Sequence, residues 1–382
     1  MNIIPAFSPR DPHEIHRAAT PLELMIDLAA VIAIAAAAHG LAHDVGEAHF
    51  MSALLRFGLG FFIIWWAWMN YTWFASAYDD NSTVFRVVSM FFMFGALVTA
   101  AGIDAVFAGE PIWLGILGYV LMRLAMVVFW LGAAKGDPER SVTAKRYAAG
   151  IAAMQVYWVL MNAAVAPDSA FYLPMMLVGI IGELAVPVHA ERHAVTTWHR
   201  HHIIERYGLL NIIVLGECFI AIVAMVHLNE GSSLPDGGYF WLASVAAIIT
   251  FSLWGVYFTD EDHLIDDELR HALLWGYGHF FVFAAGAAVG AGFIVVFQIA
   301  QGEAHVSAQV GNLAVAIPVA VYLLTLWIIR DRLCLRGLHL LCLPGAAFLV
   351  LIIGAWWSMA LEAIAAVLVV AALTRRHLPQ RN

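Results

Sequence analysis

Charged residues are scarce in this sequence. Asp, Glu, Lys and Arg together make up 12% of the 382 residues, whereas hydrophobic residues make up 62%. Soluble domains carry roughly 25% charged residues, so the composition excludes an ordinary soluble domain. The mean hydropathy of +0.81 indicates instead an integral membrane protein, whose first partner is the lipid bilayer.

Cysteine and the common catalytic motifs are also scarce or absent. The three cysteines, Cys218, Cys334 and Cys342, lie far apart, so neither a disulfide framework nor a cysteine-based metal site is predicted. No G-x-S-x-G, H-E-x-x-H, P-loop or Rossmann fingerprint occurs, which leaves the usual hydrolase and nucleotide-binding functions without support. The 17 histidines do not by their spacing alone establish convergent metal ligands. We therefore predict no metal, no cofactor and no nucleic-acid partner.

Long apolar runs fill most of the chain. A transmembrane helix needs roughly 20 mostly apolar residues, and the runs predict an all-α polytopic membrane protein with about twelve such helices. The predicted spans are 21–43, 51–76, 84–108, 112–134, 143–165, 169–190, 207–228, 238–259, 270–298, 308–329, 338–354 and 356–374.

Basic residues alternate between the predicted loops. Arg86, Arg140, Arg206 and Arg336 all fall in loops on the side of the chain termini, whereas the opposite loops carry acids only. Since Lys and Arg accumulate in cytoplasmic loops, the pattern predicts an inner-membrane protein with both termini in the cytoplasm. Residues 1–20 and 375–382 are then cytoplasmic tails, and 191–206 is a cytoplasmic linker.

Short motifs recur in the same order in the two halves. Trp68-x-x-Tyr71 is matched by Trp254-x-x-Tyr257, Arg86 by Arg270, and Glu183 by Glu362. Ordered matches of this kind indicate an internal repeat. We predict two six-helix repeats, 21–190 and 207–374, which insert in parallel and are related by an axis along the membrane normal.

Several ionisable residues fall inside the predicted spans. An ionised side chain near the bilayer centre costs at least about 2.5 kcal/mol, so such residues face a protein interior and mark candidate pathways. The candidate pathway residues are Glu23, Asp27, Arg123, Glu183, Glu217, His279 and Glu362. No catalytic residue is predicted.

Glu217 is the central candidate. By helix rise it lies roughly 14 Å into its span, a depth that Arg123 and His279 share. We therefore expect Glu217 to face the interior within reach of Arg123 or of a polar residue of the first span. A structural ion pair between Arg123 and Glu217 is one alternative, and a proton or ion relay is the other.

The other carboxylates also have two interpretations. Glu23 stands three residues after Thr20, which fits a helix capping box as well as a pathway position. Asp27 lies one turn deeper on the same helix face. We expect Glu183 and Glu362 at matching positions in the two repeats, nearer the cytoplasmic side. Pro187 follows Glu183 by one helical turn.

Three blocks carry a family resemblance. They are residues 19–41 (ATPLELMIDLAAVIAIAAAAHGL), 66–80 (WAWMNYTWFASAYDD) and 199–221 (HRHHIIERYGLLNIIVLGECFIA). Together they resemble the low temperature requirement A (LtrA) family of bacterial membrane proteins, although Met25-Ile26 departs from that family's usual LELFFD. The resemblance implies a polytopic bacterial inner-membrane protein linked by name to growth in the cold, and it implies no molecular activity.

The candidate residues favour a channel or a proton-coupled transporter for a small ion or solute. The alternatives are a membrane-embedded enzyme acting on a lipid, and a structural or sensory membrane protein involved in cold adaptation. An enzyme is expected to concentrate acids and histidines at one membrane interface, whereas a conduit distributes them through the depth. Oligomeric state does not follow from the sequence.

Overall fold

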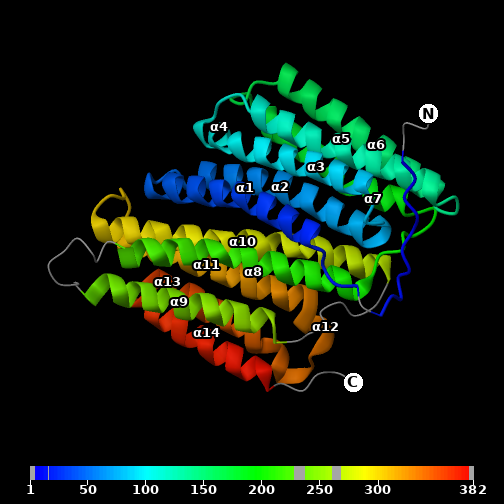
Figure 1. The fold of residues 1–382 in the computed structure, drawn as a ribbon. Helices are drawn as coiled ribbons and strands as arrows, with labels where there is room; N and C mark the ends of the chain where they lie inside the picture. The colour runs from blue at the N-terminus through cyan, green and yellow to red at the C-terminus, as the bar shows by residue number, and fades with distance from the viewer. Residues whose placement is uncertain (1–4, 16, 228–236, 260–267, 378–382) are drawn as a thin grey trace. The chain divides into compact units, whose positions relative to one another are not determined.

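The computed structural model describes residues 5–15, 17–227, 237–259 and 268–377 (Figure 1). Throughout these ranges the regular elements are helices, so the all-α prediction is confirmed. Residues 1–4 and 378–382 of the two predicted tails lie outside the described residues.

Each predicted span overlaps one long helix. In addition to the short α4 (Ile103–Ala108) and α12 (Arg332–Cys334), the described residues form twelve helices. They are α1 (Pro21–Gly46), α2 (Phe50–Tyr78), α3 (Thr83–Ala101), α5 (Trp113–Gly136), α6 (Ser141–Ala164), α7 (Tyr172–Ala190), α8 (Arg200–His227), α9 (Gly237–Tyr257), α10 (Leu269–Gln301), α11 (Ala308–Leu326), α13 (Cys342–Trp356) and α14 (Ala360–Arg376).

Ten helical stretches of the described residues are long and apolar enough to cross a membrane. Helices α6 and α14 are not among them, so twelve spans remain a prediction. Large apolar side chains also point outward, for example Val87 and Phe94 of α3 at 58% and 57% exposed, and Val223 of α8 at 66%. Apolar side chains at such positions suit contact with lipid, and charges are kept inside.

The chain divides into two compact units. Unit 1 comprises Met1–Ala36 and Leu59–Arg206, and unit 2 comprises Ala37–Gly58 and Tyr207–Asn382. The predicted repeat relationship between the halves is still a prediction. Two of its proposed counterparts have different surroundings, because Trp68 is 1% exposed and Trp254 is 49% exposed.

In unit 1, α3 packs on α5, α5 on α6, and α6 on α7. Glycines permit the closest approaches. A Cβ atom added at Gly118 of α5 would lie 2.6 Å from the carbonyl oxygen of Gly95 in α3. Small residues at such crossings are the usual means by which membrane helices pack closely.

In unit 2, α10 packs on α11, α11 on α13, α13 on α14, and α14 on α9. Gly290 of α10 lies against the backbone of α8, because a Cβ added there would lie 2.8 Å from the carbonyl carbon of Glu217. Helix α11 ends in a π-helical turn, Trp327–Asp331. This turn brings Asp331 close to Arg375 of α14. Nε of Arg375 donates to Oδ2 of Asp331 at 3.0 Å.

Candidate functional site

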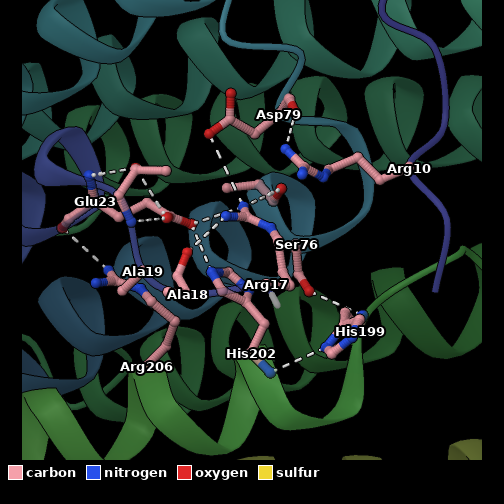
Figure 2. A network of polar contacts seen from close by, with 12 residues as sticks. Arg10, Arg17, Ala18, Ala19, Glu23, Ser76, Asp79, His199, His202 and Arg206 are labelled. Carbon is pink, nitrogen blue, oxygen red and sulfur yellow. Dashed lines mark hydrogen bonds and ion pairs between the residues drawn. The ribbon is translucent and has the colours of Figure 1, made fainter. Parts of the chain in front are cut away.

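Unit 1 buries a group of polar and ionisable side chains around the start of α1 (Figure 2). They come from the segment before α1, from α1 itself, from α2 and the residue after it, and from the first turns of α8. We call this group the polar cluster, and it consists of Arg17, Glu23, Asp27, Trp68, Asp79, His202 and Arg206. Each member is at most 6% exposed.

An ion pair between Asp27 and Arg206 forms the inner end of the polar cluster. Nη1 of Arg206 donates to Oδ2 of Asp27 at 2.6 Å, and Nη2 donates to Oδ1. The indole of Trp68 donates to the same Oδ1 at 2.7 Å. Both charged side chains are fully buried. A bidentate guanidinium and an indole donor together hold Asp27 as a fixed carboxylate.

Glu23 combines a helix cap with a buried ionic contact. The Thr20 N–H donates to Oε2 of Glu23 at 2.8 Å, and the Glu23 N–H donates to Oγ1 of Thr20 at 3.3 Å. The predicted capping box is therefore confirmed. The other carboxylate oxygen, Oε1, lies 3.0 Å from Nε2 of His202 and 3.4 Å from Nη2 of Arg17. Glu23 thus links α1 both to α8 and to the segment before α1.

The segment before α1 packs against the rest of unit 1. We call its described residues, 5–15 and 17–20, the strap. The N–H of Arg10 donates to the carbonyl of Ala77 at 2.8 Å, and Nη1 of Arg10 donates to the carbonyl of Asp79 at 2.9 Å. Arg10 also hydrogen-bonds Glu14, which lowers the pKa of that carboxyl. The strap, which is the described part of the expected amino-terminal tail, consequently belongs to the packed structure of unit 1.

Arg17 extends from the strap into the polar cluster. Its Nη2 lies 3.4 Å from Oε1 of Glu23 and 3.9 Å from Oδ2 of Asp79, and Figure 2 shows the guanidinium between the two acids. Burial raises the pKa of Asp79, against the opposing hydrogen bond from the Asn81 N–H. Arg17 therefore supplies positive charge where two buried acids approach each other.

Glu183 of α7 is the centre of a second buried group in unit 1. Its Oε2 accepts from Nη2 of Arg123 at 2.7 Å and from the Trp66 indole at 3.0 Å. Its Oε1 accepts from the Tyr119 hydroxyl at 2.8 Å and from the Trp158 indole at 3.1 Å. We call these five residues the Glu183 hub. The hub connects α2, α5, α6 and α7 through one carboxylate.

The Glu183 hub corrects one expectation. The sequence analysis gives an ion pair between Arg123 and Glu217 as one alternative, but the ion pair of Arg123 in unit 1 is with Glu183. Equal depth along two helices does not determine which helices are neighbours. The packing of α5 on α6 and of α6 on α7 brings the acid of α7 to Arg123 instead.

Glu217 of α8 is 8% exposed, so it is buried as expected. Its backbone packs against Gly290 of α10. No hydrogen bond or ion pair of its carboxyl group is present within the described part of the chain. Glu217 therefore differs from Asp27 and Glu183, each of which has an arginine.

Both ring nitrogens of His279 in α10 have hydrogen-bond partners within unit 2. Its Nδ1 lies 2.8 Å from the Trp275 carbonyl oxygen, and its Nε2 lies 3.0 Å from the Tyr257 hydroxyl. Because a carbonyl only accepts, Nδ1 carries the proton and Nε2 accepts from the tyrosine. The ring centroids of Tyr207 and Phe283 lie 5.0 and 5.4 Å from that of His279. His279 is thereby held as a neutral imidazole.

Glu362 lies apart from the other candidates. It stands in the first turn of α14, half-buried, and accepts from the indole of Trp241 at 2.9 Å. Glu183, in contrast, is in the second half of α7 and fully buried. The two acids therefore differ in burial and in their place along their own helices, and their correspondence in two repeats is still a prediction.

Comparison with known proteins places the chain in a family. The family model described as bacterial low temperature requirement A protein (LtrA) matches residues 18–374. The chain belongs to the LtrA family. Neither the search of curated proteins nor that of solved structures finds a match. Family membership and the ten apolar helices together make this LtrA chain a bacterial multi-pass membrane protein.

Sequence reasoning misses several members of the polar cluster in this LtrA chain. The seventh apolar run begins at residue 207 and so leaves Arg206 in a loop, whereas α8 begins at Arg200. One sequence signal could have indicated that His202 and Arg206 act together. Within the block 199–221 they are four residues apart, so they share a helix face. The contribution of Arg17 has no such signal, since it precedes the first helix.

Proposed function

We propose that this LtrA-family protein moves a small cation, or a solute coupled to protons, across the bacterial inner membrane, with Glu217 as the residue that exchanges its proton or cation. The observation that supports this proposal is Glu217 itself, a residue only 8% exposed whose carboxyl group has no basic partner in the described residues. A functional role is the default hypothesis for an ionisable residue inside a membrane span.

The contrast with the two paired acids is the main argument. Asp27 and Glu183 each have a buried arginine and further donors, so their negative charge is permanently compensated. An uncompensated carboxylate in an apolar environment is far more costly than a neutral one. Glu217 must therefore hold a proton or a cation, and a group that must hold one of these is suited to exchange them.

The distribution of the ionisable groups favours a conduit over a lipid-acting enzyme. The polar cluster surrounds the first turns of α1, but the Glu183 hub and Glu217 lie well inside α7 and α8. An enzyme acting on lipid head groups needs its acids and histidines at one interface. Fixed ion pairs at several depths can instead shape a polar route through the protein.

Glu217→Gln is expected to abolish coupled flux and to leave the fold unchanged. Glutamine keeps the size and one hydrogen-bonding oxygen but can neither release a proton nor bind a cation by charge. Proton and alkali-cation fluxes would be measured with purified protein in liposomes, where the variant is expected to fall to the level of protein-free vesicles. Its free energy of unfolding is expected to change by no more than about 0.5 kcal/mol, because no ion pair is lost.

The matched control is Glu303→Gln, at an exposed acid of unit 2 that follows α10. It makes the same chemical change outside the spans and is expected to retain normal flux. Normal flux in Glu217→Gln would refute the role of Glu217. Absence of flux in the unsubstituted protein under all gradients would refute the transport function itself.

We also propose twelve spans with both termini in the cytoplasm, supported by the alternation of basic residues along the chain. In this orientation Cys334, which is half-buried after the π-helical turn, faces the cytoplasm. A membrane-impermeant thiol reagent is expected to leave Cys334 unmodified in intact cells and to label it in inverted membrane vesicles, in a chain whose other two cysteines are replaced by alanine. Labelling in intact cells would reverse the orientation.

A further inference from the structure

We propose that the strap is a removable seal over the polar cluster, and that its release admits water and small ions to Glu23 and Asp27. The seal belongs to unit 1 alone and does not depend on the role proposed for Glu217. Three sets of contacts hold it, made by Phe7, by Arg10 with Glu14, and by Arg17.

Phe7 anchors the strap. Its side chain is fully buried, with ring centroids of Phe85 and Phe129 at 5.7 and 5.8 Å. The Phe7 N–H donates to the carbonyl of Gly132 at 3.1 Å. A Cβ at Gly132 would lie 2.5 Å from the Phe7 ring, so α5 accommodates this side chain only because it has a glycine there.

The middle of the strap is held by polar contacts at the end of α2 and the start of α8. Arg10 bonds two carbonyls at the end of α2, as described above. The carbonyl of Glu14 accepts from Nε2 of His199 at 2.8 Å. The His199 N–H in turn donates to Oγ of Ser76 at 2.9 Å. Through His199 the strap is thus linked to Ser76, a fully buried residue two positions before the end of α2.

Arg17 closes the seal with a charge. Its guanidinium lies between Glu23 and Asp79 and also approaches the Ala75 carbonyl at 3.4 Å. While the strap is in place, a positive charge of the chain itself occupies the position between these acids. When the strap leaves, the same acids lose their countercharge, and water or a small cation must compensate them.

The strap is also built to leave more easily than a helix. Its described residues form no helix or strand, so few backbone hydrogen bonds oppose its release. Segments outside the regular helices are drawn more often from the parts of a protein that open locally, with free energies below that of global unfolding. Burying acids such as Glu23 and Asp79 against such a segment is costly, and this cost has a purpose if these acids meet water in a second state.

The test uses a cysteine as a reporter of exposure. Ser76→Cys would be introduced into the full chain, with Cys218, Cys334 and Cys342 replaced by alanine, and modified with N-ethylmaleimide in detergent micelles. Phe7→Ala removes the anchor and is expected to raise the modification rate of the reporter about tenfold or more, as the open state becomes populated. The control Phe171→Ala, at a side chain 71% exposed, is expected to leave the rate unchanged.

Amide hydrogen exchange on the unsubstituted chain supplies a second measurement that needs no variant. The N–H groups of Phe7 and Arg10, which donate to Gly132 and Ala77, are expected to exchange well before those of α2 and α5. If they exchange only together with those helices, the strap is a fixed part of the fold and the proposal is overturned. Equal labelling of the reporter cysteine in the Phe7→Ala and Phe171→Ala proteins overturns it as well.

Neither measurement involves flux. If the strap opens in both and no transport is found, the function proposed for Glu217 is lost and the seal remains. If transport is found and the strap stays closed in every measurement, the seal is refuted and the function proposed for Glu217 remains.

Discussion

Replacing Glu183 by alanine is expected to lower the free energy of unfolding by about 3–5 kcal/mol, the cost of stranding one partner of a buried ion pair. The Arg123 guanidinium would remain fully buried without its carboxylate, and the donors of Tyr119, Trp66 and Trp158 would lose their acceptor. Denaturation of the purified protein in detergent, followed by tryptophan fluorescence, would measure the loss.

Two further variants separate charge from packing at the Glu183 hub. Glu110→Ala, at an exposed acid of the same unit, is expected to change the unfolding free energy by no more than about 0.5 kcal/mol. The double variant Glu183→Leu with Arg123→Met removes both charges and is expected to recover much of the stability lost in Glu183→Ala. A Glu183→Ala protein as stable as the control would show that Arg123 finds another partner and that the hub is not a unit.

Replacing Arg206 by methionine is expected to cause a loss of similar size, about 3–5 kcal/mol. Methionine fills much of the same volume, but among the described residues it leaves the Asp27 carboxylate with the Trp68 indole alone as a hydrogen-bond donor. Arg206→Lys is expected to fall between the methionine variant and the unsubstituted protein, because a lysine cannot donate to both oxygens of Asp27 in the bidentate manner. Thermal denaturation in detergent would rank the three proteins.

Arg86→Met is the matched control, since Arg86 is exposed at the start of α3. The double variant Asp27→Leu with Arg206→Met then distinguishes an ion pair that is only structural from one that takes part in transport. If the pair only holds α1 to α8, the double variant is expected to regain both stability and flux. If the pair belongs to a route for ions, stability returns and flux does not. Normal stability in Arg206→Met alone would contradict the ion pair.

The positions of the helices are predictable because they depend on local composition. Runs of about 20 apolar residues are sufficient to place a span, and the structure has one long helix at each run. The capping box of Thr20 and Glu23 is predictable for the same reason, since both partners lie within a single turn. Local patterns also indicate that Glu217 is buried, from its place in an apolar run.

The partners of the buried charges are not predictable, because they depend on which helices are neighbours. Arg123 and Glu183 are joined only once α5, α6 and α7 have packed, and depth along a helix cannot choose between Glu183 and Glu217. The sequence does not reveal that Arg206 belongs to a helix, because α8 begins at Arg200, before the apolar run of that helix begins. The docking of Phe7 depends on two glycines of α5, at positions 132 and 136, which nothing in the amino-terminal sequence reveals.

The Arg123–Glu183 and Asp27–Arg206 ion pairs of unit 1 also constrain how the protein is made. Arg123 of α5 leaves the ribosome before Glu183 of α7, and Asp27 of α1 leaves it long before Arg206 of α8. Insertion of a single charged side chain at a helix centre costs about 2.5–3.5 kcal/mol at the translocon. Helix α5, which has Arg123 near its middle, must therefore enter the bilayer on the strength of its apolar residues alone, or wait beside the translocon until its partner arrives. A nascent chain stopped before residue 183 would hold an unneutralised guanidinium, a natural target for membrane quality control.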